Sequence, residues 1–325
     1  MKNKNIIIVN ILFVFIGIGV IFLLSRESKP VIVLNPESNE LEGGDFLKED
    51  GLPNSASATS AIAVLQRPQP TSSVSEPRMF SDAFLTPQTL EESAKISKSS
   101  NKNWWLNSGG RLYVSNGTAK TIQGDLAPSD AWYKRYIRSN PEDTDDGAHP
   151  QNIFRLVNTH VWGDFTQQAY FKINSLILSE SPNRNASNGV LLFNRYQTGD
   201  DLYYTGIRVD GAAVIKKKIK GAYYTMAMKK IFGTKNQKYD RDSEPNLLPV
   251  ATWIGVKSEV ITNQDASVTI RLYVDEGKTG VWRLVLETKD KAESYGPSPL
   301  TNAGYAGIRT DFMDVEFDDY SIVEL

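Results

Sequence analysis

The segment from Leu202 to Phe232 constrains the fold most, because it alternates between two kinds of side chain and is interrupted by glycines. From position 202 to 209 the odd positions are mostly β-formers, whereas the even positions carry Tyr204 and Arg208. Strict alternation sends the two sets to opposite faces of a sheet. Asp210-Gly211 then gives a strong hairpin signal. The segment therefore predicts a meander of antiparallel strands.

One face of this predicted meander gathers phenols and cations. Lys216 and Lys218 fall on the face opposite to Ala213, and a turn at Gly221 leads into a further strand that contains Tyr223. Between residues 212 and 232 the sequence has six lysines and no acidic residue. Such a face either binds a partner or is a solvated surface whose charge also prevents edge pairing.

Composition restricts the partners and the chemistry of the chain. The sequence has 325 residues, a net charge of -2 and no cysteine. Balanced charge argues against a general nucleic-acid binder, so we expect no nucleic-acid partner. The lack of cysteine excludes disulfides, thiolate metal sites and cysteine nucleophiles. Because His149 and His160 are the only histidines, a multi-histidine zinc site is not expected either.

The N-terminal residues predict a membrane tether. Residues 6–24 form an almost unbroken apolar run that follows Lys2 and Lys4, and its length is close to the ~20 residues that span hydrocarbon. No small-x-small cleavage site follows, so we expect residues 1–25 to be an uncleaved signal-anchor helix. The protein would then be a single-pass protein of the cell membrane with an extracellular domain. Cleavage of the segment would instead make it secreted.

Two further regions follow the apolar run. Residues 26–78 are dominated by Ser, Thr, Pro and Gly, which predicts a disordered stalk. Residues 79–325 show many short strands and little helical periodicity, which predicts an all-β, antiparallel two-sheet sandwich without a convincing amphipathic helix. Gly109-Gly110 and Asn116-Gly117 are hairpin signals within this domain.

Four segments of the domain carry a resemblance to a known superfamily. They are FSDAF near its start, WWLNSGGRLYVSNG, GVLLFNRYQTGDDLYYTGIRVDG and the closing AGIRTDFMDVEFDDYSI. Together they resemble the concanavalin A-like lectin/glucanase superfamily, with laminin-G-like and carbohydrate-binding jelly rolls as the closest types. The resemblance implies a jelly-roll sandwich in which the first and last strands meet. It leaves the function open, because this superfold hosts binding modules, glycosidases and polysaccharide lyases.

The resemblance also implies a structural calcium ion held by an aspartate of the closing strand. The alternation of that strand changes phase at Asp318 and Asp319, which predicts a β-bulge. A bulge frees carbonyls beside two carboxylates, and Ca²⁺ prefers such mixed oxygen ligands. Asp82 on the first strand is a further candidate ligand. The alternative is that these are solvated or hydrogen-bonded aspartates.

Two kinds of catalysis are possible on this scaffold. A glycoside hydrolase needs two carboxylates that flank the bond, and Asp314 and Glu316 share a face, but on the terminal strand, where the family has its edge. A polysaccharide lyase needs cations, a base and an acid around a uronate. The candidate lyase residues are His160, Tyr204 and Arg208.

A carbohydrate-binding surface needs no proton transfer. Aromatic rings cover the apolar faces of sugars, and cations pair with carboxylate or sulfate groups. The candidate residues are aromatic or cationic: Trp162, Tyr196, Tyr204, Arg208, Lys216, Lys218 and Tyr223, with Trp253 as a further aromatic candidate. We therefore expect a tethered, lectin-like domain whose partner is a polysaccharide with acidic groups. Protein adhesion or a structural role is the alternative, and core positions are the alternative for Trp253 and Trp282.

Overall fold

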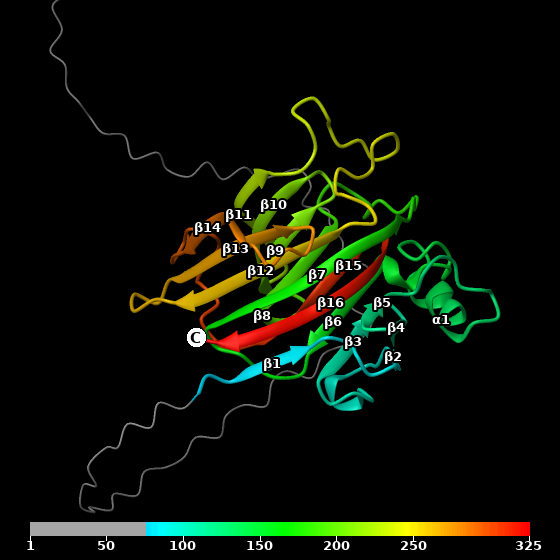
Figure 1. Cartoon of the computed structure of the whole chain (residues 1–325), viewed down its shortest axis with the longest axis horizontal. Helices are drawn as coiled ribbons and strands as arrows, with labels where there is room; N and C mark the ends of the chain where they lie inside the picture. Colours follow the sequence, from blue (N-terminus) through cyan, green and yellow to red (C-terminus); the bar gives the residue numbers. More distant parts are fainter. Residues whose placement is uncertain (1–75) are drawn as a thin grey trace, which may run out of the picture. The chain divides into compact units, whose positions relative to one another are not determined.

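Two antiparallel sheets face each other in the computed structural model, which describes residues 76–325 (Figure 1). The predicted two-sheet antiparallel sandwich is confirmed. The expected signal anchor at residues 1–25 and the expected stalk up to residue 75 lie outside the described residues. Within residues 76–325, no helix has the length and apolar character needed to cross a bilayer.

The larger sheet has nine strands, and we refer to it as the large sheet. Its order is β14 (Arg283–Asp290), β13 (Val268–Glu276), β12 (Trp253–Thr262), β7 (Phe165–Leu176), β16 (Met313–Glu324), β5 (Thr118–Lys120), β4 (Arg111–Ser115) and β2 (Gln88–Glu91), with β1 (Met79–Asp82) also paired to β16. The first and last strands therefore meet, in the register Met79 to Val323. However, β16 lies in the interior of the sheet, between β7 and β5, which corrects the expectation that the terminal strand is an edge.

The smaller sheet has seven strands, and we refer to it as the small sheet. Its order is β11 (Ala222–Lys230), β10 (Ala212–Ile219), β9 (Asp201–Arg208), β8 (Gly189–Thr198), β15 (Tyr305–Asp311), β6 (Ile153–Asn158) and β3 (Trp104–Ser108). Asp210-Gly211 forms the predicted hairpin between β9 and β10, and Gly211 has a φ of 80°. The predicted meander from β9 to β11 is confirmed.

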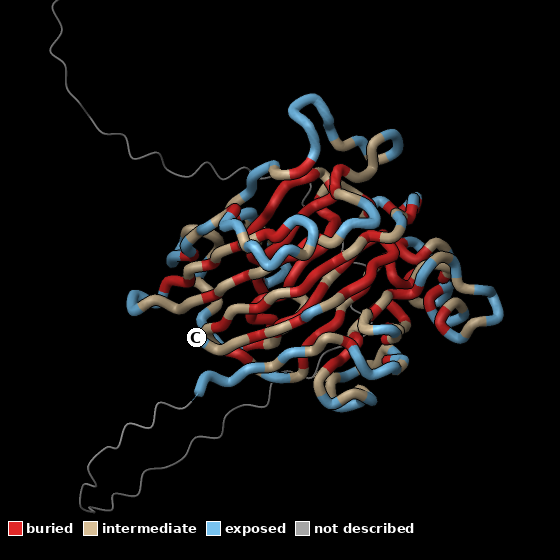
Figure 2. Tube along the Cα trace, viewed as in Figure 1, coloured by how far each residue is buried: buried red, intermediate tan, exposed pale blue. Residues whose placement is uncertain are grey.

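Apolar side chains fill the space between the sheets. Phe154 of the small sheet stacks on Phe317 of the large sheet, with ring centroids 5.3 Å apart, and Phe171 meets the same ring edge-on at 5.7 Å. All three are fully buried, and each such side chain contributes about 1.5–3 kcal/mol of transfer free energy. Figure 2 shows buried residues along the strands and exposed residues in the connecting loops.

Two local predictions from the sequence are wrong. Gly109-Gly110 does not close a hairpin, because β3 belongs to the small sheet and β4 to the large sheet. The chain crosses between the sheets here, and a Cβ on Gly109 would lie 2.6 Å from the Phe154 ring. The sandwich domain, for which no convincing amphipathic helix was expected, contains a helix, α1 (Ala131–Ser139), whose first turn is capped by the Asp130 carboxylate.

The remaining local predictions agree with the structure. Asn116-Gly117 connects β4 and β5 as a hairpin. The register between β16 and β7 shifts after Asp318, and Asp319 has a φ of 47°, so the predicted bulge is present. Short 3₁₀ turns, η1 (Ile96–Lys98) and η2 (Pro150–Asn152), complete the regular elements of residues 76–325.

Candidate functional site

The outer face of the small sheet carries its own aromatic cluster. Along β9, Tyr203 points into the core between the sheets, and Tyr204 points to the other face, as the alternation predicts. The ring of Tyr204 lies 5.6 Å from Phe193 on β8 and 6.2 Å from Tyr223 on β11, nearly parallel to the latter at 24°. Three strands of the small sheet thus bring their rings together across β10, which lies between β9 and β11.

Cationic side chains lie beside these rings. Lys216 stands opposite Tyr204 in the register of β10 and β9, and its Nζ lies 5.7 Å from the Tyr223 ring. The Nζ of Lys218 lies 5.0 Å from the same ring. Arg309 of β15 holds its guanidinium 5.3 Å from the Tyr204 ring and donates a hydrogen bond of 3.1 Å to the Tyr204 hydroxyl. Cation–π contacts of this kind orient both partners.

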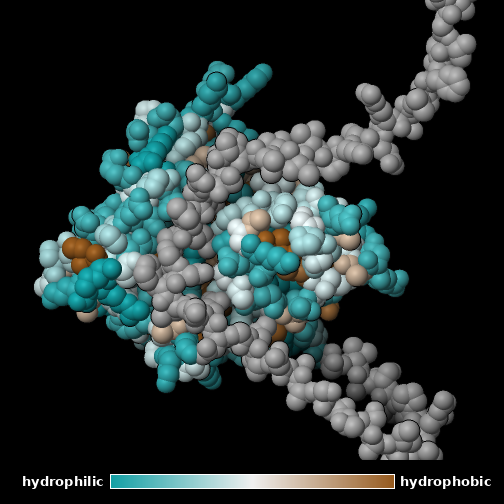
Figure 3. Space-filling view, turned by 180° about the vertical axis from the view of Figure 1, so that it is seen from behind, coloured by the Kyte–Doolittle hydropathy of each residue, from teal (hydrophilic) through white to brown (hydrophobic). Residues whose placement is uncertain are grey.

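These side chains surround a depression of about 330 Å³, which we name the aromatic–basic pocket. Its lining residues are Ser187, Asn188, Leu191, Tyr204, Val214, Lys216, Tyr223 and Arg309. Viewed from behind, the coloured residues of Figure 3 are mostly hydrophilic, with small separate apolar patches.

The charges of the pocket favour an anion. Its lining contains two cations, Lys216 and Arg309, and no acidic side chain among residues 76–325. Lys216 donates to the neutral hydroxyl of Ser187 at 3.2 Å, and Arg309 pairs with Asp311 at 2.8 Å. Lys218 pairs with Asp200 at 3.2 Å at the margin. An arginine held in a fixed direction suits planar carboxylate or sulfate groups, which accept charge-assisted hydrogen bonds.

Not all of the predicted ligand-binding residues line this pocket, and Lys218 is among those outside its lining. Arg208 donates to the carbonyl of Ala186 at 3.0 Å and pairs with Asp210 at 2.9 Å, so it holds the adjoining loops. Tyr196 is buried against Phe193. Trp162 belongs to the core between the sheets, is 1% exposed and donates to Asn158 at 3.0 Å. The structure thus gathers Tyr204, Lys216 and Tyr223, with Lys218 beside them.

The three residues expected for a lyase are not assembled. His160 is exposed and its ring lies 6.1 Å from Phe80 of β1, whereas Tyr204 lines the aromatic–basic pocket. The sequence reasoning also missed Arg309. Alternation along β15 places Arg309 and Ile308 on opposite faces, but only the pairing of β15 with β8 shows which tyrosine Arg309 meets.

The residues expected to bind calcium already bond to protein groups. Asp82 accepts hydrogen bonds from the Phe84 amide at 2.7 Å and from the Trp104 indole at 2.8 Å. Asp318 and Asp319 both pair with the ammonium of Lys278, the latter at 3.1 Å. Within residues 76–325 no three acidic or histidine side chains gather as metal ligands. The calcium ion stays a prediction.

The carboxylates considered for hydrolysis have structural partners. Asp314 accepts from the Gly124 amide at 2.8 Å and from Ser175 at 2.7 Å. Burial raises the pKa of Glu316, but hydrogen bonds from Lys172 and Lys120 outweigh it, so the pKa lies below its usual value. A glycosidase acid needs the opposite shift. Glu316 is therefore unsuited to that role.

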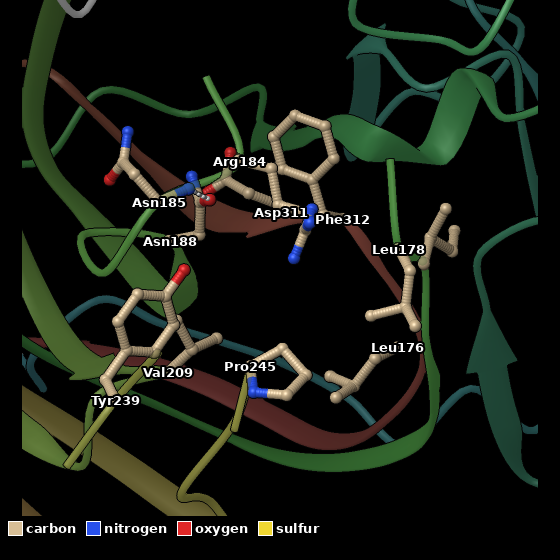
Figure 4. Close-up of a pocket in the computed structure, with 11 residues that line it drawn as sticks. Leu176, Leu178, Arg184, Asn185, Asn188, Val209, Tyr239, Pro245, Asp311 and Phe312 are labelled. Carbon is tan, nitrogen blue, oxygen red and sulfur yellow. Dashed lines mark hydrogen bonds between the residues drawn. The ribbon is translucent and has the colours of Figure 1, made fainter. Parts of the chain in front are cut away.

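A second depression, of about 250 Å³, lies where loops meet at one end of the sandwich (Figure 4). Figure 4 shows Tyr239 and Pro245 on one side of it and Phe312 on the other. Its cation, Arg184, pairs with Asp242 at 3.0 Å and donates to two backbone carbonyls. Arg184 thus ties loops together, and the aromatic–basic pocket is the stronger candidate site.

No family model matches the sequence. No curated protein sequence matches it either. Among solved structures, the carbohydrate-binding module CBM66 from Bacillus subtilis is 14% identical over 68% of this chain and 96% of that one, with a TM-score of 0.39. A Bacillus licheniformis β-glucanase is 8% identical over 78% and 99%, with a TM-score of 0.41. A Bacillus subtilis protein with a galectin-like fold is 11% identical over 69% and 90%, with a TM-score of 0.36.

These structural neighbours are concanavalin A-like jelly-roll proteins, the type that the sequence segments resemble. Their identities and TM-scores are too low to carry an argument about the ligand of this chain. The fold rests on the strand order and register of residues 76–325, and the function has to be argued from the side chains of the pocket.

Proposed function

We propose that the aromatic–basic pocket binds a polysaccharide that carries carboxylate or sulfate groups. The observation that carries the proposal is one depression lined by Tyr204, Tyr223, Lys216 and Arg309, without an acidic lining residue. The half-buried ring of Tyr223, with the buried ring of Tyr204 stacked 6.2 Å from it, would cover the apolar face of a sugar unit, and the cations would pair with its anionic substituent. The neutral Ser187 and Asn188 would serve its hydroxyl groups.

Affinity electrophoresis or calorimetry of the full chain with alginate, polygalacturonate and heparin tests this proposal. We expect binding to at least one of them, and Lys216→Ala should weaken it about tenfold, the loss of one charge-assisted hydrogen bond. Lys229→Ala is the matched control, because Lys229 is an exposed lysine of β11 that stands opposite Ala213 in the strand register. Ala213 faces the core, so Lys229 does not lie on the face that carries the pocket. If Lys216→Ala binds as tightly as the original chain, or if both variants lose affinity equally, the pocket is not the binding site.

A polysaccharide lyase is the second candidate, and one contact favours it. Arg309 donates to the hydroxyl of Tyr204, which places a cation beside a phenol. A lyase uses such a pair to neutralise a uronate and to move a proton. Incubation with alginate or polygalacturonate distinguishes a binding domain from a lyase. Growth of the ultraviolet absorption band of unsaturated products, and its loss in Tyr204→Phe, would show that the protein cleaves the polysaccharide.

We also propose that residues 1–25 anchor the protein in the cell membrane with the sandwich outside. The support is the length of the apolar run at residues 6–24 and the basic residues before it. Fractionation of expressing cells tests this. Protein that stays with membranes after a carbonate wash and is cut by external protease agrees with it, and protein in the soluble fraction does not.

A further inference from the structure

The outer face of the large sheet carries a second aromatic cluster, which we name the tryptophan strip: Tyr170, Trp253 and Trp282. Ile254 and Val256 of β12 fill the core between the sheets, so Trp253 and Lys257 point outward. Tyr170 lies on the neighbouring strand β7, between core residues. Both tryptophans are half-buried rather than core residues, which corrects the core position considered for them. Figure 1 shows β12 and β7 side by side on this face.

Gly255 leaves the space that the indole of Trp282 occupies. A Cβ on Gly255 would lie 2.7 Å from Cη2 of Trp282 and 2.7 Å from Cε1 of Tyr170. The indole therefore rests directly on the backbone of β12, beside the Tyr170 ring at 5.4 Å. Any side chain at Gly255 would displace one of the two rings. The sheet thus holds Trp282 in a fixed place although this residue precedes β14 in a connecting segment.

Lysine ammonium groups lie over the rings of the strip. The Nζ of Lys257 lies 4.3 Å from the Trp282 ring, and the Nζ of Lys278 lies 5.1 Å from Trp253 and 5.5 Å from Tyr170. A third ammonium, that of Lys172, lies 5.0 Å from Trp253. Lysine heads sit on flexible stems, so they can move aside for a ligand and then hydrogen-bond to it.

The charges around the strip are balanced by neighbouring acids. Glu316 of β16 pairs with Lys172 at 2.7 Å and with Lys120 at 3.0 Å. Asp318 and Asp319 pair with Lys278, as described above. The strip thus combines fixed rings with both donors and acceptors and has no excess of positive charge from these pairs. That combination matches sugar rings whose hydroxyl groups donate and accept hydrogen bonds.

We propose that the tryptophan strip is a second, separate binding site, and that its ligand is a neutral polysaccharide chain. The fixed rings stack on successive sugar faces, and the paired lysines and carboxylates bind their hydroxyl groups. The two outer faces of the sandwich then take different glycans, because the aromatic–basic pocket has cations and no acidic lining residue within the described chain. The strip does not depend on that pocket for any of its contacts.

Affinity electrophoresis of the full chain in gels that contain hydroxyethyl cellulose, barley mixed-linkage glucan or dextran tests the strip. We expect retardation by at least one of these neutral polysaccharides. Trp253→Ala and Trp282→Ala should each weaken it about tenfold, because each removes a stacking ring. Gly255→Ala should weaken it as well, because the added Cβ displaces the ring of Trp282 or that of Tyr170. Trp282→Phe keeps a ring on Gly255 and should retain part of the retardation.

Two variants serve as controls, and each variant is first checked for an unchanged melting temperature. Val281→Ala truncates an exposed neighbour of Trp282, 73% accessible, and should leave the retardation unchanged. Lys216→Ala, which tests the aromatic–basic pocket, should also leave it unchanged, so the two sites can fail independently. Absence of retardation in all three gels, or normal retardation of both tryptophan variants, overturns the proposal.

Discussion

Two pairs of neighbouring residues on β9 and β10 show how differently the same side chains are used on opposite faces of one sheet. Tyr203 and Lys217 face each other in register, and so do Tyr204 and Lys216. The first pair points into the core and meets Asp290 of β14: Tyr203 donates to its carboxylate at 2.5 Å, and Lys217 pairs with it at 2.9 Å. The second pair lines the aromatic–basic pocket.

The difference teaches that residue type alone does not identify a site here. Lys217 and Asp290 are both fully buried, so their charges serve each other and tie β10 to β14 across the core. Such a pair is costly to break, because the remaining charge would stay without a partner in a medium of low polarity. Lys216 lies at the surface of the pocket, where an added ligand can reach it.

Truncation of the inner lysine gives the largest expected effect on this comparison. Lys217→Ala leaves the buried carboxylate of Asp290 without its ion-pair partner, so we expect the free energy of unfolding to fall by about 3–5 kcal/mol. The double variant Lys217→Met/Asp290→Leu removes both charges and should recover most of that loss. Urea denaturation of the full chain measures both. A loss below about 1 kcal/mol in the single variant would show that the pair is not buried as described.

The next largest expected effect is a difference in stability between variants of Tyr203 and of Tyr204. Tyr203→Phe removes a donor to Asp290 and an acceptor for the amide of Leu300, which lies 2.9 Å away. Loss of these buried hydrogen bonds should lower the free energy of unfolding by about 1–3 kcal/mol. Tyr204→Phe removes the acceptor of one hydrogen bond from Arg309, so it should cost less stability and should instead reduce glycan affinity, because Arg309 loses the group that orients it in the pocket. Equal destabilisation by the two variants would remove the distinction between the faces.

The free energy of unfolding should depend on alkaline pH through the buried phenol of Tyr203. Burial raises the pKa of this phenol well above its usual value near 10, and the negative charge of Asp290 raises it further. The native phenol stays protonated where the unfolded one ionises, so its contribution is complete below pH 10 and is lost as the pH rises. Each pH unit above about 10 should cost about 1.4 kcal/mol from this group. Urea titrations between about pH 9.5 and 11.5 should show a shallower decline in Tyr203→Phe, and an identical decline would contradict this account.

The smallest expected change in stability comes from the outer lysine. Lys216→Ala should alter the free energy of unfolding by no more than about 0.5 kcal/mol, as is usual for substitutions away from the core. Its effect should be confined to the glycan measurement. If urea denaturation shows a loss similar to that of Lys217→Ala, then Lys216 supports the sheet and the pocket is not a ligand site.

Much of the fold could be predicted because its signals are local. A period of two separates Tyr203 from Tyr204, and Asp210-Gly211 needs positive φ within a few residues of the strands that it joins. The same kind of signal failed at Gly109-Gly110, because a glycine turn shows that the chain bends and not whether the next strand stays in the same sheet. The helix α1 was missed because its nine residues are too few for a clear helical period.

Less of the candidate site could be predicted, because its contacts join distant segments. The sequence placed phenols and cations on one face of β9 to β11, and three of them line the pocket. It could not place Arg309 beside Tyr204, 105 residues earlier, because this contact depends on β15 pairing with β8. The sequence also could not predict that Trp162 lies in the core, since an isolated tryptophan fits a surface and a core equally well.

The sequence by itself determined the all-β class, the hairpins and the division of each strand into two faces, since these follow from side-chain alternation and turn residues that act over a few positions. Only the tertiary structure decided which strands are neighbours. That choice placed β16 inside the large sheet, set Asp290 against Lys217 and laid Trp282 on Gly255. Strand pairing over long sequence separations depends on how both sheets bury their apolar faces together, and no local segment encodes it.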